Sequence, residues 1–194
     1  MVYWSRIRTK INIPSKTKLA FILFLAIIIL FTRGSHFLTE LSLPDASLIS
    51  FLILGILSPS LILFVLFFIL GSLIDFGSAI FDVSKGFYLS NGYWGLIPAY
   101  YVMFVCGQLI ESKNFLSKIN LYLIILFGST TLAFIISTNT YYMFSGRFGN
   151  PSLLESILQG WNYYPGYLIP NIIYGLIFYG IYKLNIKKYF LKLI

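Results

Sequence analysis

The chain has 194 residues, of which 58% are hydrophobic, 19% aromatic and only 10% charged. A soluble domain of this composition would expose large apolar patches and aggregate, so the sequence predicts an all-α integral membrane protein. The net charge of +8 is compatible with nucleic-acid binding, but its distribution along the chain is explained by membrane topology, and we expect no nucleic-acid partner. The single cysteine, Cys106, excludes an internal disulfide and a cysteine-based zinc cluster.

Apolar runs predict six transmembrane helices within a single domain, residues 1–194. Their expected ranges are 18–32, 46–58, 60–75, 93–110, 119–138 and 166–183. Basic residues precede the first run, as in a signal peptide, but no small-residue cleavage site follows it, so we expect this helix to be retained. The second run is short for a span and forms a tight hairpin with the third.

The basic residues predict the orientation of these helices. Eleven of the fourteen lysine and arginine residues lie before the first helix, between the fourth and fifth, or after the sixth. The other three are Arg33, Lys85 and Arg147. The positive-inside rule then places the N- and C-termini in the cytoplasm, as in a multi-pass protein of the cell's inner (cytoplasmic) membrane.

The last expected outer loop, residues 139–166, is rich in aromatic residues interleaved with polar ones. Within it, residues 151–158 predict a short amphipathic helix on the membrane surface, because Leu154, Ile157 and Leu158 share a face. The aromatic residues, Trp161 among them, have two interpretations. They form a lid and wall for a large, flat, amphipathic ligand, or they form an interfacial aromatic belt.

Ionisable residues near the outer helix ends are candidates for a site. Asp75 stands at the expected end of the third helix, where a carboxylate must be hydrated, paired or hydrogen-bonded. Arg33, at the outer end of the first helix, is its expected partner, and contact with a ligand is the alternative. His36, the only histidine, is a candidate metal ligand or proton acceptor, although a single histidine at a helix end more often forms structural hydrogen bonds.

Enzyme motifs are absent from the sequence: it contains no Walker A, H-E-x-x-H, G-x-S-x-G or paired-carboxylate pattern. Cys106 with an arginine and His36 would be the one catalytic constellation, as in membrane cysteine transpeptidases, but Cys106 is expected in the inner half of the fourth helix, away from both. We therefore expect no enzyme. A sortase-like or lipid-modifying membrane enzyme and a purely structural membrane protein are the alternatives.

The stretch from Thr32 to Tyr101 carries a resemblance to a known family. The matching features are Thr32-Arg33-Gly34 with His36-Phe37, Leu43-Pro44-Asp45-Ala46-Ser47, Asp75, Gly86-Phe87 with Tyr93, and Pro98-Ala99-Tyr100. This part, a little over a third of the chain, resembles the BtuM family, which comprises solitary cobalamin-binding S-components of energy-coupling-factor (ECF) type transporters.

The resemblance implies an S-component-like bundle of six helices that binds cobalamin or a related corrinoid at its outer face and carries it across the membrane. The corrinoid is then the transported ligand and not a catalytic cofactor. Expected partners are the corrinoid and the lipid bilayer. Two alternatives stay open for energy coupling: an ECF energising module with a transmembrane coupling subunit and ATPases, or action of the protein alone. The resemblance assigns Asp75 and Tyr93 to the binding site, and Arg33, His36 and Asp45 to its first outer loop. An S-component for a different vitamin is the alternative.

Tyr88 departs from the family pattern. The resemblance implies a cysteine after Gly86-Phe87, whose thiolate coordinates cobalt and is tied to reductive decyanation. A phenol is a poor soft ligand for cobalt, so we expect a site that includes Tyr88 but has neither thiolate coordination nor decyanation chemistry. Three alternatives remain: His36 binds the cobalt, no protein group does, or the ligand is another molecule.

Overall fold

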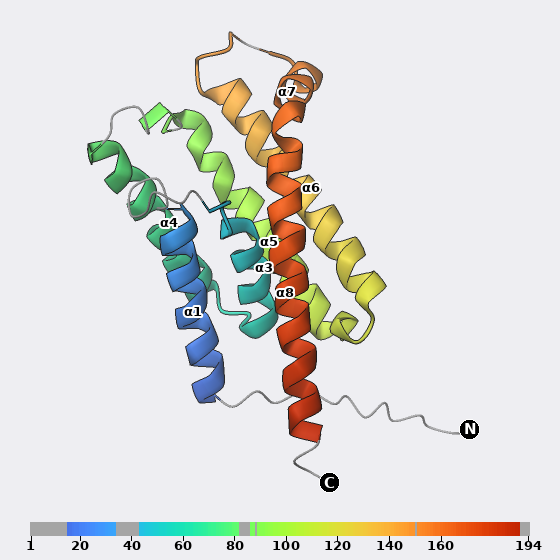
Figure 1. The fold of residues 1–194 in the computed structure, drawn as a ribbon. Coiled ribbons are helices and arrows are strands. Elements are labelled where there is room, and N and C mark those ends of the chain that lie inside the picture. Colours follow the sequence, from blue (N-terminus) through green and yellow to red (C-terminus); the bar gives the residue numbers. More distant parts are fainter. Residues whose placement is uncertain (1–14, 34–42, 82–85, 88, 150, 191–194) are drawn as a thin grey trace.

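A computed structural model describes residues 15–33, 43–81, 86–87, 89–149 and 151–190, with backbone alone for residues 15–17 and 185–190. Within these ranges the chain is helical and contains no strand (Figure 1). The longer helices are α1 (Ser15–Arg33), α3 (Ser47–Leu57), α4 (Leu61–Phe81), α5 (Leu96–Ser112), α6 (Ile119–Phe144) and α8 (Tyr164–Phe190). The short helices are η2 (Asn91–Gly95), η3 (Phe115–Ser117), α7 (Leu153–Gly160) and η4 (Trp161–Tyr163).

Two helices extend well beyond their expected ends. The expected end of the third helix at Asp75 is wrong, because α4 continues to Phe81. The Asp75 carboxylate forms an ion pair with Arg33, so the helix can continue past this charged residue. The expected end at residue 138 is wrong as well, since α6 continues to Phe144. As a result, most of the expected loop 139–166 is helical. The final helix is also longer than the expected range 166–183.

Among the described residues, four helical segments are long and apolar enough to cross a membrane. They are Leu61–Phe81, Asn91–Ser112, Ile119–Phe144 and the continuous stretch Leu153–Leu184. In the apolar 18-residue stretch of α4, only 17% is buried inside the protein. Ile62 and Ile80 on this helix are 73% and 79% exposed. Such a surface is stable against lipid and not against water, which indicates a membrane protein.

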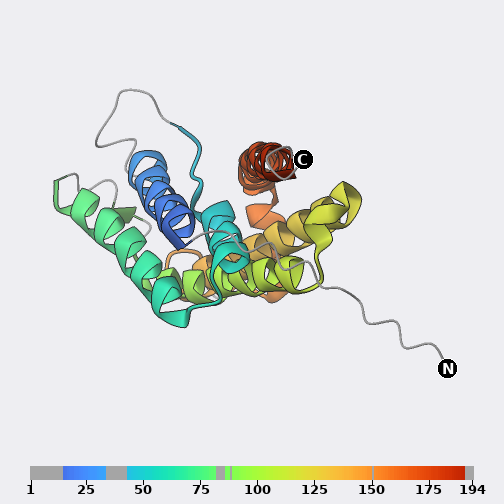
Figure 2. The same cartoon turned by 90° about the horizontal axis from the view of Figure 1, so that it is seen from below.

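The helix α3 is short and entirely enclosed by the protein. Its eleven residues are all buried, and it packs against α1, α4, α5 and α8 (Figure 2). At 1.5 Å per residue its length is about 16 Å, roughly half of the hydrocarbon core. The contact with α5 is especially close, because a Cβ atom on Gly55 would overlap the carbonyl oxygen of Phe104 and one on Gly107 would overlap that of Leu52. This is backbone-to-backbone packing through small residues.

The bundle has two chemically different ends. The start of α1, residues 58–60, residues 113–118 and the end of α8 lie at one end, and we call it the lysine end after Lys18, Lys113, Lys118 and Lys183 (Figure 1). At the opposite end, the loop end, lie the end of α4, η2, the end of α6, and α7. Helix α1 ends, and α3 begins, part-way along α4 and α8.

Candidate functional site

The side chain of Arg33 joins four helices. Its Nε donates to Asp75 Oδ1 at 2.7 Å and its Nη2 donates to Asp75 Oδ2 at 2.6 Å, which forms a bidentate pair between α1 and α4. Its Nη1 donates to Ser47 Oγ of α3 at 2.9 Å and to the hydroxyl of Tyr100 in α5. The Arg33 side chain is only 9% exposed. One guanidinium group therefore connects α1, α3, α4 and α5.

Asp75 is held from a second side by Tyr93. The Tyr93 hydroxyl donates to Asp75 Oδ2 at 2.9 Å and lies 3.3 Å from Ser72 Oγ. The carboxylate thus accepts three hydrogen bonds, whereas its two oxygens offer about four acceptor sites. Tyr93 is placed by η2, which sits tightly on α6, because a Cβ atom on Gly95 would overlap the side chain of Thr140. Asp75 is therefore largely saturated by the protein itself.

Asp45 closes the network at the start of α3. Its Oδ1 accepts from the backbone nitrogen of Ser47 at 2.9 Å and from Ser47 Oγ at 2.6 Å. Its Oδ2 lies 3.5 Å from Arg33 Nη1, and its side chain is 50% exposed. Thr32 Oγ1 accepts from the backbone nitrogen of Ala46 at 3.2 Å. Asp45 is thus the most accessible charged group of what we call the Arg33 network: Arg33, Asp45, Ser47, Ser72, Asp75, Tyr93 and Tyr100.

Aromatic and apolar groups pack around this network. The ring of Tyr100 stacks on Phe51, with centroids 4.5 Å apart and planes 12° apart. Gly71 lies one turn before Asp75, and a Cβ atom there would be 3.7 Å from Arg33 Nε, so the guanidinium group rests against the α4 backbone. Phe51 also contacts the rings of Phe64 and Phe67, and all three are buried. In such surroundings a charge needs a partner, since an unpaired buried charge is costly.

Asp75 lies inside Leu61–Phe81, a segment long and apolar enough to cross a membrane, and Arg33 pairs with it there. Counted at 1.5 Å per residue, Arg33 is about 22 Å from Lys18 along α1, and Asp75 is about 21 Å from Leu61 along α4. Both lengths are shorter than the hydrocarbon core of about 30 Å. Ionisable residues at such depth are rare, pair with one another, and mark substrate pathways, so this network is the candidate functional site.

The structure brings together three of the residues predicted to form the site. Arg33, Asp75 and Tyr93 converge, and the predicted pairing of Arg33 with Asp75 is confirmed. His36 and Tyr88 lie outside the described residues. Sequence reasoning missed the part played by Tyr100 and Ser47. Both belong to the segments that carry the family resemblance, which was the available signal.

Trp161 lies elsewhere, where η4 joins α8. Its ring stacks on Tyr164, with centroids 4.8 Å apart, and the Tyr164 hydroxyl is 2.6 Å from Thr131 Oγ1 of α6. Trp161 is 51% exposed. It therefore belongs to the α6–α8 side of the molecule and is not part of the Arg33 network.

The short helix predicted at residues 151–158 is confirmed as α7. It begins with a capping box, in which Ser152 Oγ accepts from the backbone nitrogen of Glu155 and Glu155 Oε2 accepts from that of Ser152. Its buried face carries Ser156, whose Oγ donates to Asn139 Oδ1 at 2.6 Å. Leu154 and Leu158 are 66% and 65% exposed. The small residues Ser156 and Gly160 thus face the protein, whereas Leu154 and Leu158 point outward, which favours the membrane-surface interpretation.

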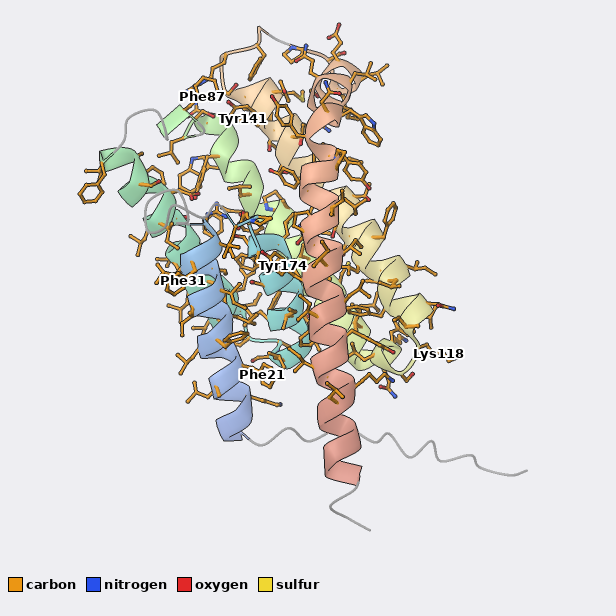
Figure 3. All side chains as sticks on the ribbon, viewed as in Figure 1. Phe21, Phe31, Phe87, Lys118, Tyr141 and Tyr174 are labelled. Carbon is orange, nitrogen blue, oxygen red and sulfur yellow. The ribbon has the colours of Figure 1, made fainter. Side chains whose placement is uncertain are left out.

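The two connections at the loop end touch each other. The guanidinium carbon of Arg147, which follows α6, lies 3.9 Å from the ring centroid of Phe87, which follows α4. Phe87 and Tyr141 both lie at this end of the molecule (Figure 3). This cation–π contact ties the segment after α4 to the segment after α6.

The described residues include no group of three or more His, Cys, Asp or Glu residues that could hold a metal ion. Cys106 is half-buried in α5, six residues beyond Tyr100 toward the lysine end, or about 9 Å along the helix axis. The Arg33 network holds helix ends together, and Asp45 offers a half-exposed acceptor.

No protein-family model matches the chain, and no curated protein matches it in sequence.

Proposed function

We propose that the protein is a membrane-embedded binding and translocating component for the uptake of cobalamin or a related corrinoid. One observation carries the proposal. The residues that support the resemblance to the BtuM family are scattered between Thr32 and Tyr100, yet Arg33, Asp45, Asp75 and Tyr93 meet in a single network within the membrane thickness. A shared site explains why these residue types occur together in this order.

The network divides into a frame and an accessible rim. Arg33, Asp75 and Tyr93 use most of their hydrogen-bonding capacity on one another, so they act as the frame that positions the ends of α1, α3 and α4. Asp45 is the accessible acceptor for the amide groups at the edge of a corrin ring. Trp94 packs edge-on against Tyr93 and is 57% exposed, so it offers aromatic surface next to Tyr93.

The topology that accompanies this proposal has six membrane segments. The four long helical segments are joined by α1 and by the enclosed helix α3, whose short length is tolerated because protein surrounds it. The lysine end faces the cytoplasm, so the network opens toward the outer side of the inner membrane. Energy from ATP would come from a partner, an ECF-type module.

The ligand is held without a thiolate. Tyr88 stands where the resemblance implies the cobalt-binding cysteine, and Cys106 lies on α5 toward the lysine end. We therefore propose binding without decyanation, with His36 as the candidate cobalt ligand.

Two experiments test the proposal. Purified protein is titrated with cobalamin and with cobinamide while the visible spectrum is recorded, and a corrinoid-requiring, uptake-deficient bacterial strain is tested for growth rescue. We expect binding and rescue by the wild type and by Cys106→Ala, and reduced affinity for Asp45→Asn. Glu155→Gln is the control, because it also removes one exposed carboxylate but does so in α7, outside the Arg33 network. Failure of the folded protein to bind either corrinoid contradicts the proposal.

A cysteine at position 88 gives a spectroscopic test of the resemblance. If the position corresponds to the cobalt-binding cysteine, Tyr88→Cys gains a cobalt–sulfur absorption change that the wild type lacks. Phe87→Cys is the control, since it places a thiol one residue away. An equal change in both variants, or in neither, contradicts the correspondence.

A further inference from the structure

A hollow of about 570 Å³ lies at the lysine end, where α6 begins beside α8. It is lined by Ser117, Lys118, Ile119, Asn120, Leu121 and Tyr179. Ile119 is also the first residue of an apolar segment long enough to cross a membrane, and Lys118, labelled in Figure 3, directly precedes it in the chain. Volumes of about 300–1,000 Å³ are typical of small-molecule sites.

Two lysine side chains supply positive charge to this hollow. Lys118 is part of its wall and is exposed. Lys183 is held beside it, because its Nζ donates to the carbonyl oxygen of Ser117 at 3.4 Å and lies 5.4 Å from the ring centroid of Tyr179. Within the described part of the chain, neither lysine forms an ion pair. Glu111 is the acidic residue among the described residues of this end, and its side chain is exposed.

We propose that the hollow binds the headgroup of an anionic phospholipid. Lys118 and Lys183 bracket the phosphate, while Ser117 and Asn120 offer polar groups to the glycerol. Leu121 and Tyr179 provide apolar surface for the upper part of an acyl chain. Basic pockets between membrane helices recognise headgroups in this way. This site is independent of the corrinoid site, since it lies at the other end of the bundle.

The position and charge of the hollow select this class of ligand. At the membrane boundary, phospholipid headgroups are the most abundant phosphates. Phosphatidylcholine carries a quaternary ammonium group, which would approach two lysines that form no ion pair among the described residues, so it should bind more weakly than phosphatidylglycerol.

Native mass spectrometry of the full chain in detergent tests the proposal, with phosphatidylglycerol and phosphatidylcholine added in parallel. We expect a bound phosphatidylglycerol in the wild type. Lys118→Gln and Lys183→Gln should each weaken its affinity about fivefold. Lys113→Gln is the matched control: it removes the same charge at the same end but from a residue outside the lining, and the affinity should change less than twofold.

Three outcomes would overturn the proposal. One is an equal loss of affinity in Lys113→Gln, and another is equal binding of phosphatidylcholine. The third is displacement of the lipid by equimolar inorganic phosphate, which would make a soluble phosphate the ligand. Circular dichroism confirms that each variant is folded. If Lys183→Gln unfolds, Lys118→Gln still decides, because the Lys118 side chain is exposed.

Discussion

Arg33 and Lys183 are both cations near the ends of bundle helices, but they differ in how much of their hydrogen-bonding capacity the protein uses. Arg33 is buried and donates to Asp75, Ser47 and Tyr100. Lys183 contacts one carbonyl oxygen and the ring of Tyr179. A planar guanidinium group suits several fixed acceptors, whereas an ammonium group is a mobile point charge. Arg33 therefore holds the helices together, whereas Lys183 is available to a molecule outside the protein.

The largest expected effect comes from removing the buried cation. Arg33→Leu leaves the Asp75 carboxylate without its bidentate partner, and we expect a loss of about 3–5 kcal/mol in the free energy of unfolding. Thermal or denaturant unfolding in detergent micelles measures it. Arg33→Leu combined with Asp75→Leu should recover part of the loss, since no unpaired charge remains. A single variant as stable as the wild type would show that the pair does not assemble the helices.

The second effect concerns the hydroxyl group that Tyr93 donates to Asp75. Tyr93→Phe keeps the ring but removes one hydrogen bond to a charged group, so we expect a loss of about 1.5–3 kcal/mol in the same unfolding assay. Tyr101→Phe on α5 is the control, because its side chain is 45% exposed. Equal changes in the two variants would mean that the hydrogen bond to Asp75 contributes nothing specific.

Asp45 should matter much less to stability than Asp75. It is half-exposed and 3.5 Å from Arg33 Nη1, and an asparagine can still accept hydrogen bonds from Ser47. For Asp45→Asn we expect at most about 1 kcal/mol of destabilisation, the range of exposed ion pairs. A loss comparable to that of Arg33→Leu would place Asp45 in the frame and not at the rim.

The smallest effect is expected at the lysine end. Lys183→Gln in lipid-free detergent should change the free energy of unfolding by no more than about 0.5 kcal/mol, because the residue has no carboxylate partner among the described residues. A loss above about 2 kcal/mol would remove the contrast with Arg33 and make Lys183 a structural residue.

The helices and part of the site could be predicted from local patterns. Apolar runs located the long helices, and Ser152 with Glu155 marks the start of α7. The distribution of the basic residues placed Arg33 and Asp75 on the same outer side, which led to the prediction that they pair. The ends of α4 and α6 were missed, because Asp75 and Asn139 look like helix-ending polar residues until their partners, Arg33 and Ser156, are known.

Tyr100 shows why the rest of the site was out of reach. A tyrosine in an apolar helix is usual at interfaces and in cores, and its hydroxyl acquires a role only because the side chain of Arg33 reaches it from α1. That contact depends on how two helices 67 positions apart in the chain pack together.

The sequence alone determined that the protein belongs in a membrane and where its long helices lie, because hydropathy and helix signals are sums over neighbouring residues. Only the tertiary structure decided that α3 is enclosed on all sides, that Gly55 and Gly107 bring two backbones into contact, and that one arginine joins four helices. These features arise from distances between segments far apart in the chain, and such distances are set by packing.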